Sequence, residues 1–239
     1  MTLDLARRGV HAVLLDIEGT TTPIAFVHDV LFTFARARLD VYLDSRTGSP
    51  ELVEVERQLT AEYAEDAVRG DAPQPWSTAA YARWLMDRDR KSPGLKRLQG
   101  QIWEEGYRAG ALRGEVYDDV PRAMRRWRAA GVDVAIYSSG SELAQRRLFG
   151  STVHGDLTPL VTGFFDTAAG AKVEPASYAR IAGVLGRLPR EVLFVSDVVA
   201  ELVAARGAGM GVALSVRPGN PPQPAAGEFE IVATLDQVV

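Results

Sequence analysis

The chain contains no cysteine among its 239 residues. This excludes disulfide bonds and thiol chemistry, and it fits a cytoplasmic protein without requiring that location. Histidine is also scarce, and the spacing of His11, His28 and His154 matches no metal-binding motif. Sites built from cysteine or clustered histidine ligands are therefore not expected.

Long apolar runs and an excess of positive charge are missing as well. The first ten residues, MTLDLARRGV, lack the apolar stretch of a secretion signal, and no later run is long enough to span a bilayer. The formal net charge is −4, and no basic stripe runs along the sequence. We therefore expect neither a membrane nor a nucleic acid as a partner.

A short apolar run, Ala12–Leu15, is followed at once by Asp16, Glu18 and Gly19. A run this short, ended by acidic residues and glycine, is typical of a buried strand that opens into a loop. Two carboxylates two positions apart are costly to hold together unless a cation or a phosphoryl group compensates them. Two solvated acids at the end of a strand are the simpler alternative, and only the rest of the chain can decide between these interpretations.

The remaining chain shows two kinds of pattern. Residues 24–116 have helical spacing without a convincing strand, whereas short apolar runs alternate with helices from residue 117 onward. We therefore expect an α/β core with a doubly wound, mostly parallel sheet, formed by residues 1–23 and 117–239. A helical cap is expected at residues 24–116.

The individual elements follow from periodicity and from capping residues. In the cap, the first helix is predicted to present Val27, Val30, Leu31, Phe34, Arg38 and Val41 on one face. The other cap helices are predicted at residues 50–68, after the capping residue Ser77, and at residues 95–107. In the core, strands are predicted at residues 132–137, 191–196 and 211–216, and Asp118 or Asp119 is predicted to cap a helix.

Polar residues follow three of the predicted strands. These are Asp16 with Glu18, Ser138 with Ser139, and Asp197, while Lys172 stands just before a helix. The carboxyl ends of parallel strands lie at one edge of the sheet, so these groups can converge. Taken alone, each residue also has a structural interpretation, such as a turn at Ser138 or a helix cap at Asp197.

Together these residues have the parts needed for phosphoryl transfer through a covalent aspartyl-phosphate. Asp16 can attack phosphorus, and Asp16 with Asp197 can hold Mg²⁺ through oxygen ligands. A serine hydroxyl such as that of Ser138 can bind phosphate oxygens, and Lys172 can neutralise their charge. Glu18 stands where a general acid and base is needed.

The order of these residues resembles the haloacid dehalogenase superfamily, and longer stretches resemble its enolase-phosphatase family, the acireductone synthases of methionine salvage. Glu18, where most superfamily phosphatases carry aspartate, is itself discriminating. Thr33, where proline is expected, is a minor departure that bears on helix geometry. The matching stretches are LDIEGTT, FVHDVLF, LQGQIWEEGY, IYSSGS, GDLTPLVTGFFDT, AKVEPASY, FVSDVVAELVAARGAGM and VRPGN, from Val13 to about Asn220.

The resemblance implies an Mg²⁺-dependent enzyme with a small phosphorylated diketone as its substrate. Such enzymes enolise 2,3-diketo-5-methylthiopentyl-1-phosphate and then remove its phosphate, which gives 1,2-dihydroxy-3-keto-5-methylthiopentene (acireductone). A monomer is in line with the family. By similarity, the metal-linked acids are Asp16, Glu18 and Asp197, and the substrate-binding residues are Ser138, Ser139 and Lys172.

Several points stay open at the level of sequence. Glu18 and Lys172 are both candidates for the base that removes the C1 proton, and a lysine base would need a lowered pKa. A phosphatase of the same fold for another small metabolite is the nearest alternative. A non-catalytic phospho-receiver domain is a more distant one, since receivers are shorter and carry the acceptor aspartate on a later strand. Candidates for contact with the thioether tail are Phe26, Trp76, Trp84 and Trp103, although aromatic residues at helical spacing more often belong to a core.

Overall fold

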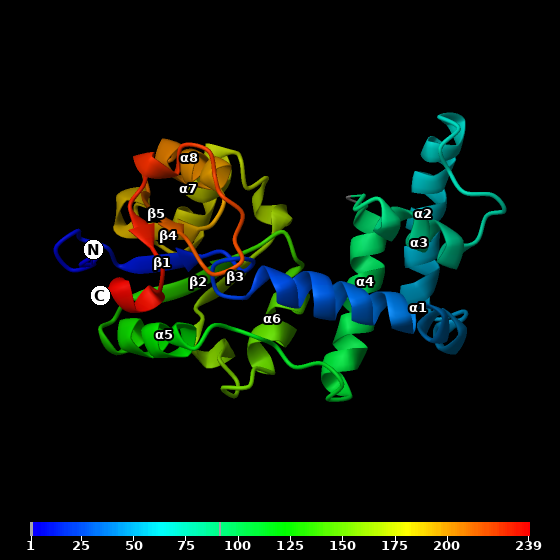
Figure 1. The fold of residues 1–239 in the computed structure, drawn as a ribbon, viewed down its shortest axis with the longest axis horizontal. Helices are drawn as coiled ribbons and strands as arrows, with labels where there is room; N and C mark the ends of the chain where they lie inside the picture. Colours follow the sequence, from blue (N-terminus) through cyan, green and yellow to red (C-terminus); the bar gives the residue numbers. More distant parts are fainter. Residues whose placement is uncertain (1, 91) are drawn as a thin grey trace. The chain divides into compact units, whose positions relative to one another are not determined.

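The computed structural model describes residues 2–90 and 92–239, which form two compact units (Figure 1). The first unit comprises Met1–Val27 and Arg113–Val239, and the second comprises His28–Leu112. The sequence pattern puts the corresponding changes at residues 24 and 116. No helix within the described residues is long and apolar enough to cross a membrane.

The first unit is built on a parallel sheet with the strand order β3-β2-β1-β4-β5-β6. All four residues of β1 are buried, as expected for a central strand covered on both faces. The four strands predicted from the sequence are confirmed to within one residue at each end, whereas β3 and β6 are too short to carry a periodic pattern. The strands are β1 (Ala12–Leu15), β2 (Asp133–Tyr137), β3 (Gly163–Phe165), β4 (Val192–Ser196), β5 (Gly211–Ser215) and β6 (Ile231–Val232).

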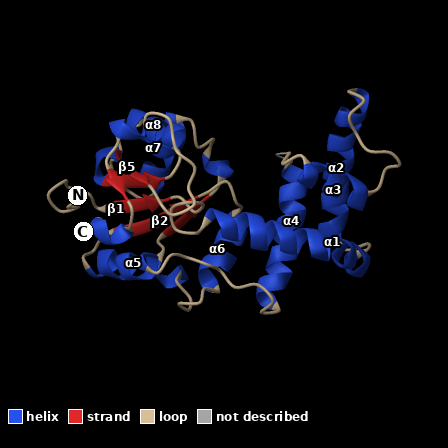
Figure 2. Ribbon diagram, in the orientation of Figure 1, coloured by secondary structure: helices blue, strands red, loops and turns tan. Residues whose placement is uncertain are grey.

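Helices cover both faces of this sheet (Figure 2). On one face, Tyr178 of α7 and Leu202 of α8 pack with Leu14 and Phe194 in a fully buried cluster. On the other face lies α5, whose Trp127 is buried and donates through Nε1 to the carbonyl of Val238 at 2.9 Å. The helices of this unit are α5 (Asp119–Ala129), α6 (Glu142–Gly150), α7 (Pro175–Val184) and α8 (Val199–Gly207).

The second unit is helical and has a core of its own. Leu39, Leu52, Leu59 and Leu98 are buried together at its centre. Serine side chains accept from backbone N–H groups at the starts of α2, α3 and α4, which confirms the predicted cap at Ser77. The helices are the π-helix η1 (Phe26–Phe32), α1 (Thr33–Arg46), α2 (Pro50–Val68), α3 (Thr78–Asp87) and α4 (Pro93–Arg108).

The predicted face of the first helix is only partly buried: Val27 and Leu31 lie in the core, but the face does not continue into α1. Arg38 and Val41 are exposed, and the buried residues of α1 are Ala35, Leu39 and Tyr42. The preceding segment, η1, is a π-helix, which has more residues per turn than an α-helix. A prediction that continues one α-helical period through both segments therefore assigns the wrong residues to the core.

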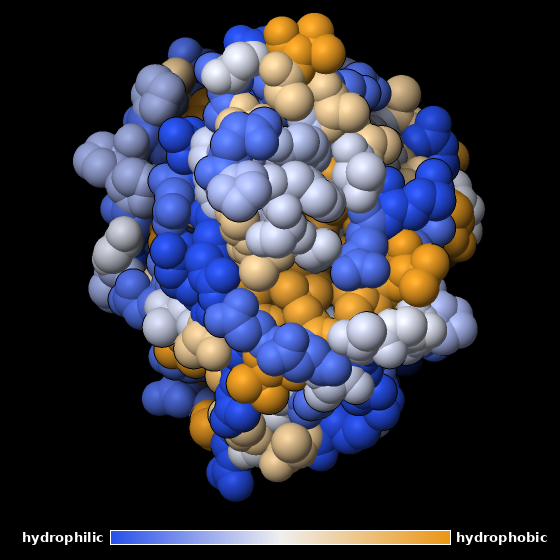
Figure 3. All heavy atoms as spheres, turned by 90° about the vertical axis from the view of Figure 1, so that its right-hand side faces the viewer, coloured by the Kyte–Doolittle hydropathy of each residue, from blue (hydrophilic) through white to orange (hydrophobic). Residues whose placement is uncertain are grey.

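Large apolar side chains also reach the surface, for example Val68, which is 89% exposed. Figure 3 shows one face on which apolar residues gather near the centre and hydrophilic residues surround them. Apolar atoms contribute much of the surface of ordinary folded proteins. These residues do not by themselves mark a binding site.

Candidate active site

Asp16, Ser138 and Asp197 directly follow three neighbouring strands, β1, β2 and β4. Leu15 pairs with Ile136 on one side and with Val195 on the other, so these strands end at the same level. In open parallel sheets this edge is where ligands bind. The strand pairing therefore brings the ends of the three strands, each with its polar residue, to one edge of the first unit.

The loop after β1, residues 16–22, folds tightly around one carbonyl group. The backbone N–H groups of Thr20, Thr21 and Thr22 all donate to the carbonyl of Ile17, at 2.9–3.2 Å. Gly19 has a φ of +65°, and a Cβ at this position would collide with the carboxylate of Asp197. Only glycine adopts this conformation without strain and leaves room for that carboxylate. We call residues 16–22 the aspartate loop.

Lys172 contacts Asp16 directly. Its Nζ lies 2.6 Å from Asp16 Oδ1 and 2.7 Å from Glu201 Oε2, and all three side chains are almost completely buried. The backbone of Lys172 is held by Tyr178, whose hydroxyl donates to the Lys172 carbonyl at 2.7 Å. The loop before α7 thus delivers an ammonium group to the end of β1.

The charges in this cluster change one another's protonation. Burial alone lowers the pKa of Lys172, but Asp16 and Glu201 outweigh this effect and the pKa ends above its usual value. Burial, followed by the negative charge of Asp16, raises the pKa of Asp197 to about 7. The same two causes raise the pKa of Glu201. Three buried carboxylates therefore lie near a single ammonium group, so negative charge exceeds positive charge in the cluster.

The cluster fits a divalent cation that prefers oxygen ligands. Within the described residues, no Lys or Arg forms an ion pair with Asp197. The amide oxygen of Asn220 is buried without a hydrogen-bond partner there, and it lies beside the same face of Gly19 as Asp197. The described residues contain no group of three or more His, Cys, Asp or Glu side chains arranged to hold a metal ion. A cation such as Mg²⁺, which often takes one or two carboxylates and completes its shell with phosphate and water, suits this set.

The other predicted site residues, Glu18 after β1 and Ser138 with Ser139 after β2, differ in exposure. Ser138 is buried, and its hydroxyl accepts from the N–H of Gly140 at 3.1 Å, whereas Ser139 is exposed. Glu18 is also exposed. In the part of the chain that the structure describes, neither serine is hydrogen-bonded to Asp16 or Lys172. The structure thus joins Asp16, Lys172 and Asp197 in one cluster and leaves the substrate-binding roles of the serines as predictions.

Glu201 and Ser196 belong to the cluster but were not predicted from the sequence. The Ser196 hydroxyl donates to Glu201 Oε2 at 2.9 Å and lies 3.3 Å from Asp16 Oδ2. Glu201 stands in the first turn of α8, four positions after Asp197. An acid in the first turn of a helix that follows a polar strand end is the signal that could have identified it.

The helical unit contains a pocket that has a different character. It is lined by residues of α2, α3 and the start of α4, including Glu62 and Asp66, and by Arg90 and Ser92 between α3 and α4. The buried carboxylate of Asp66 is already paired there, because it accepts from the Tyr81 hydroxyl and from Arg90, both at 2.8 Å. This arrangement ties α2 to α3 and to Arg90, which follows α3.

The chain is similar to known proteins over most of its length. A family model described as haloacid dehalogenase-like hydrolase matches residues 10–209. The enolase-phosphatase E1 of Synechococcus elongatus is 49% identical over 217 residues, which cover 88% of this chain and 90% of that protein. The chain belongs to the enolase-phosphatase E1 family.

Other members of this family differ in length. A probable bifunctional methylthioribulose-1-phosphate dehydratase/enolase-phosphatase E1 of Oryza sativa subsp. indica is 43% identical, and the match covers 95% of this chain but 47% of that protein. Among solved structures, the UTR4 protein of Saccharomyces cerevisiae has a TM-score of 0.76 at 33% identity, with 94% of this chain and 98% of that chain covered. The fold of the enolase-phosphatase chain is therefore shared over nearly its whole length.

Proposed function

We propose that this enolase-phosphatase family member converts 2,3-diketo-5-methylthiopentyl-1-phosphate to 1,2-dihydroxy-3-keto-5-methylthiopentene and phosphate in one Mg²⁺-dependent site. The observation that carries the proposal is the buried contact between Lys172 and Asp16, with Asp197 beside it at the edge of the sheet. We also propose that the enzyme is cytoplasmic and monomeric, and that the helical unit acts as the cap.

In the phosphatase step, a carboxylate oxygen of Asp16 attacks phosphorus, and the bond between phosphorus and the substrate oxygen breaks. Glu18 donates a proton to that leaving oxygen. Water then attacks the phosphorus of the aspartyl-phosphate, and Glu18 takes up a proton from it, so that phosphate leaves and Asp16 is restored. Lys172 neutralises the charge on the phosphate oxygens, and Ser138 and Ser139 donate hydrogen bonds to them.

For the enolisation step, Lys172 is less suited as base, because its Nζ already pairs with the carboxylates of Asp16 and Glu201 at 2.6 and 2.7 Å and an ammonium group cannot accept a proton. We therefore assign removal of the C1 proton to Glu18. The proton that Glu18 gains in this step is the one it needs for the leaving oxygen in the next. One carboxyl group then serves both reactions in alternating protonation states.

Asp16 and Asp197 would hold the Mg²⁺, with Glu18 in the same loop. Bound there, the cation supplies positive charge that stabilises both the enediolate and the phosphate. This assignment is supported by the shortage of positive charge around Asp197. Magnesium chloride should raise the melting temperature of the metal-free enzyme, and Asp197→Asn should abolish that rise.

The reaction is tested by mixing the enzyme with the diketone phosphate and following ultraviolet absorbance of the enol together with release of phosphate. The wild type should give both signals and should need Mg²⁺ for phosphate release. Asp16→Asn should lower phosphate release by about 10³-fold or more while an enol signal remains, because Glu18 is still present. Phosphate release without any enol signal would point instead to a phosphatase for another small metabolite.

The matched control is Asp118→Asn in the same unit, where the side chain is 86% exposed. This variant should keep both signals, and the melting temperatures of the two variants show whether each is folded. Undiminished phosphate release by Asp16→Asn would exclude the covalent mechanism. A folded wild type with no activity on the diketone phosphate would exclude the proposed function.

A further inference from the structure

Arg217 is a buried arginine two positions after the end of β5. Its side chain is 3% exposed, and its NH1 lies 2.8 Å from the carboxylate of Asp119, which is 7% exposed. The guanidinium group also stacks over the ring of Tyr117 at 4.5 Å. A buried ion pair of this kind is seldom a net source of stability, so stability alone does not account for it.

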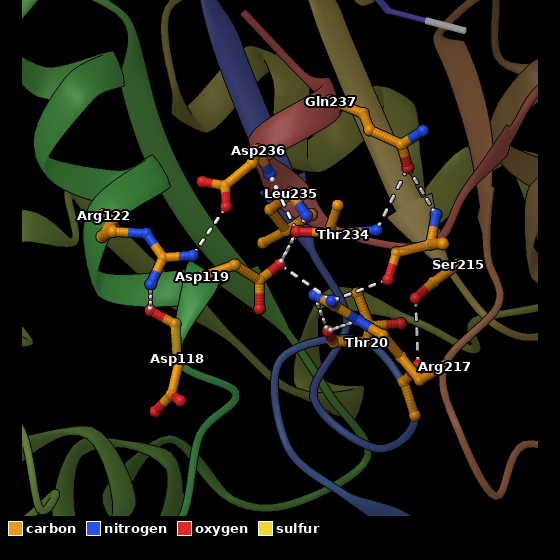
Figure 4. A network of polar contacts seen from close by, with 12 residues as sticks. Thr20, Asp118, Asp119, Arg122, Ser215, Arg217, Thr234, Leu235, Asp236 and Gln237 are labelled. Carbon is orange, nitrogen blue, oxygen red and sulfur yellow. Dashed lines mark hydrogen bonds and ion pairs between the residues drawn. The ribbon is translucent and has the colours of Figure 1, made fainter.

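The guanidinium group of Arg217 points at the backbone of the aspartate loop (Figure 4). Its Nε and NH2 donate to the carbonyl of Thr20 at 3.2 and 3.1 Å, while NH1 donates to the carbonyl of Ala233 at 3.0 Å. All three nitrogens of the side chain are therefore used within the unit. Two of them donate to the same carbonyl group, that of Thr20, which lies four positions after Asp16.

The neighbouring carbonyl groups of the loop are held in the same way. The Ser215 hydroxyl and the Asn220 amide donate to the carbonyl of Gly19, at 3.0 and 2.9 Å. The backbone N–H of Tyr117 donates to the carbonyl of Thr21 at 3.0 Å. Three consecutive carbonyl groups, those of residues 19, 20 and 21, are thus fixed from outside the loop.

The other end of the network reaches the C-terminal segment of the chain. Asp119 begins α5, but instead of capping that helix its carboxylate accepts from the Thr234 hydroxyl at 2.9 Å and from the Leu235 N–H at 2.5 Å. The helix begins at the predicted position, with Asp118 as its N-cap residue, but the predicted side-chain cap is wrong: the Asp118 side chain makes no capping hydrogen bond, and the Asp119 carboxylate pairs with Arg217. The ion pair with Asp119 holds Arg217 in the orientation in which it donates to the Thr20 carbonyl.

We propose that Arg217 is a positioning residue. It fixes the backbone of the aspartate loop and thereby the orientation of the Asp16 side chain. Arg217 contacts neither the Asp16 carboxylate nor Lys172 in the described structure, so it acts through the loop backbone. Misplacing a reacting group by about 1 Å can cost about 100-fold in rate. The inference rests on the proposed role of Asp16, and the test therefore includes a measurement that does not depend on activity.

The main variant is Arg217→Lys, which keeps the positive charge beside Asp119 but has a single nitrogen and cannot hold Asp119 and the Thr20 carbonyl in the same way. Ser215→Ala is a milder second variant, which removes one donor to Gly19 and leaves the ion pair. The matched control is Arg126→Lys, because Arg126 also donates to two carbonyl groups, those of Leu235 and Val238, without touching the loop.

Amide hydrogen exchange of the peptide covering residues 16–23 is the first measurement, and kcat and KM for phosphate release are the second. In Arg217→Lys we expect loop amides to exchange about tenfold faster or more, and kcat to fall about 10- to 100-fold with KM within about threefold of the wild type. Ser215→Ala should show the same changes at smaller size. Arg126→Lys should leave both the loop exchange and kcat unchanged.

Unchanged loop exchange in a folded Arg217→Lys variant would overturn the proposal, as would a loss of kcat that Arg126→Lys reproduces at the same melting temperature. If Arg217→Lys does not fold, Ser215→Ala decides by the same two measurements. If loop exchange is faster in Arg217→Lys but the wild type is inactive on the diketone phosphate, the role of Arg217 in fixing the loop is supported. Only the proposed function is then contradicted.

Discussion

The Nζ of Lys172 lies 2.6 Å from Oδ1 of Asp16, although the two residues are 156 positions apart in the chain. Both side chains are nearly excluded from solvent, and Glu201 shares the same ammonium group. The amine is therefore the main positive charge that the chain itself supplies to a cluster of three carboxylates. Removing the amine should therefore leave Asp16 and Glu201 without their cation.

Lys172→Met should be strongly destabilising as well as inactive. The variant leaves Asp16 and Glu201 as buried carboxylates without a cation, and breaking a buried pair typically costs about 3–5 kcal/mol. Urea unfolding at pH 8 measures the loss. The control is Arg8→Met, which breaks a more exposed ion pair with Glu230 and should cost less than about 1 kcal/mol. Equal losses in the two variants would contradict this account.

Glu201→Gln should separate stability from activity. The amide oxygen can still accept from the Ser196 hydroxyl, while the variant loses a carboxylate whose pKa is raised by burial and by Asp16. We expect an unfolding free energy at pH 8 that is unchanged or higher by about 1 kcal/mol, because a buried unfavourable charge is gone. Lys172 would then pair with Asp16 alone and hold the nucleophile more tightly, so kcat should fall about tenfold.

The control for this variant is Glu142→Gln, which removes an exposed partner of Arg146 within α6. It should change neither quantity appreciably. A loss of more than about 2 kcal/mol in Glu201→Gln at pH 8 would mean that the Glu201 carboxylate stabilises the fold, and this interpretation of the cluster would be wrong.

The sequence was sufficient to predict the strands that precede Asp16, Ser138 and Asp197. Each strand end is marked by a local change from apolar to polar residues, and the carboxyl ends of parallel strands lie at the same edge of the sheet. The contact of Lys172 with Asp16 agrees with that reasoning, although the roles of these residues in catalysis stay predictions. The face of α1 was missed because a π-helix changes the period ahead of it, which no residue type in Phe26–Phe32 announces.

Partners of side chains were harder to foresee than their places in the sheet. Asp119 has the sequence context of a helix cap, and only the long-range packing of the C-terminal segment turns its carboxylate toward Arg217. Arg217 lies in a Pro- and Gly-rich stretch that is typical of a surface loop, yet its side chain is buried. Such pairings depend on tertiary contacts, and a single sequence contains no periodic signal for them.

Gly19→Ala should lower both stability and activity by more than the strain of a positive φ accounts for. Gly19 and Gly9 both have a φ of +65°, but a Cβ at Gly19 would meet Asp197 and Asn220, whereas a Cβ at Gly9 would meet nothing within 4 Å. Gly9→Ala should therefore cost about 1–2 kcal/mol, the usual cost of the left-handed conformation. Gly19→Ala should cost more and should also lower kcat about 100-fold by displacing Asp197. Equal losses of stability with unchanged kcat would show that the clash is relieved elsewhere.

The stability of the first unit at low pH should depend on Asp133, which joins the end of α5 to the segment before β4. Its two carboxylate oxygens each accept from one arginine, Arg128 and Arg187, at 2.8 Å. Burial by itself raises the pKa of Asp133, but the two arginines outweigh it and the pKa ends below its usual value. The folded state therefore binds the proton less readily than the unfolded state does.

The sign of the pH dependence follows from this difference. The contribution of Asp133 is fully present above the unfolded pKa, which is about 3.9, and it is lost as the pH falls through the lower folded value. Asp133→Asn should therefore cost about 1–3 kcal/mol at pH 6. Below about pH 4 the gap to the wild type should narrow, since protonation of the wild-type Asp133 carboxylate removes a charge that the variant already lacks. Urea unfolding at several pH values between 6 and 3 measures this, with the exposed Asp118→Asn as the variant that should follow the wild type throughout. A gap that stays constant down to pH 3 would mean that the Asp133 carboxylate does not act through its charge.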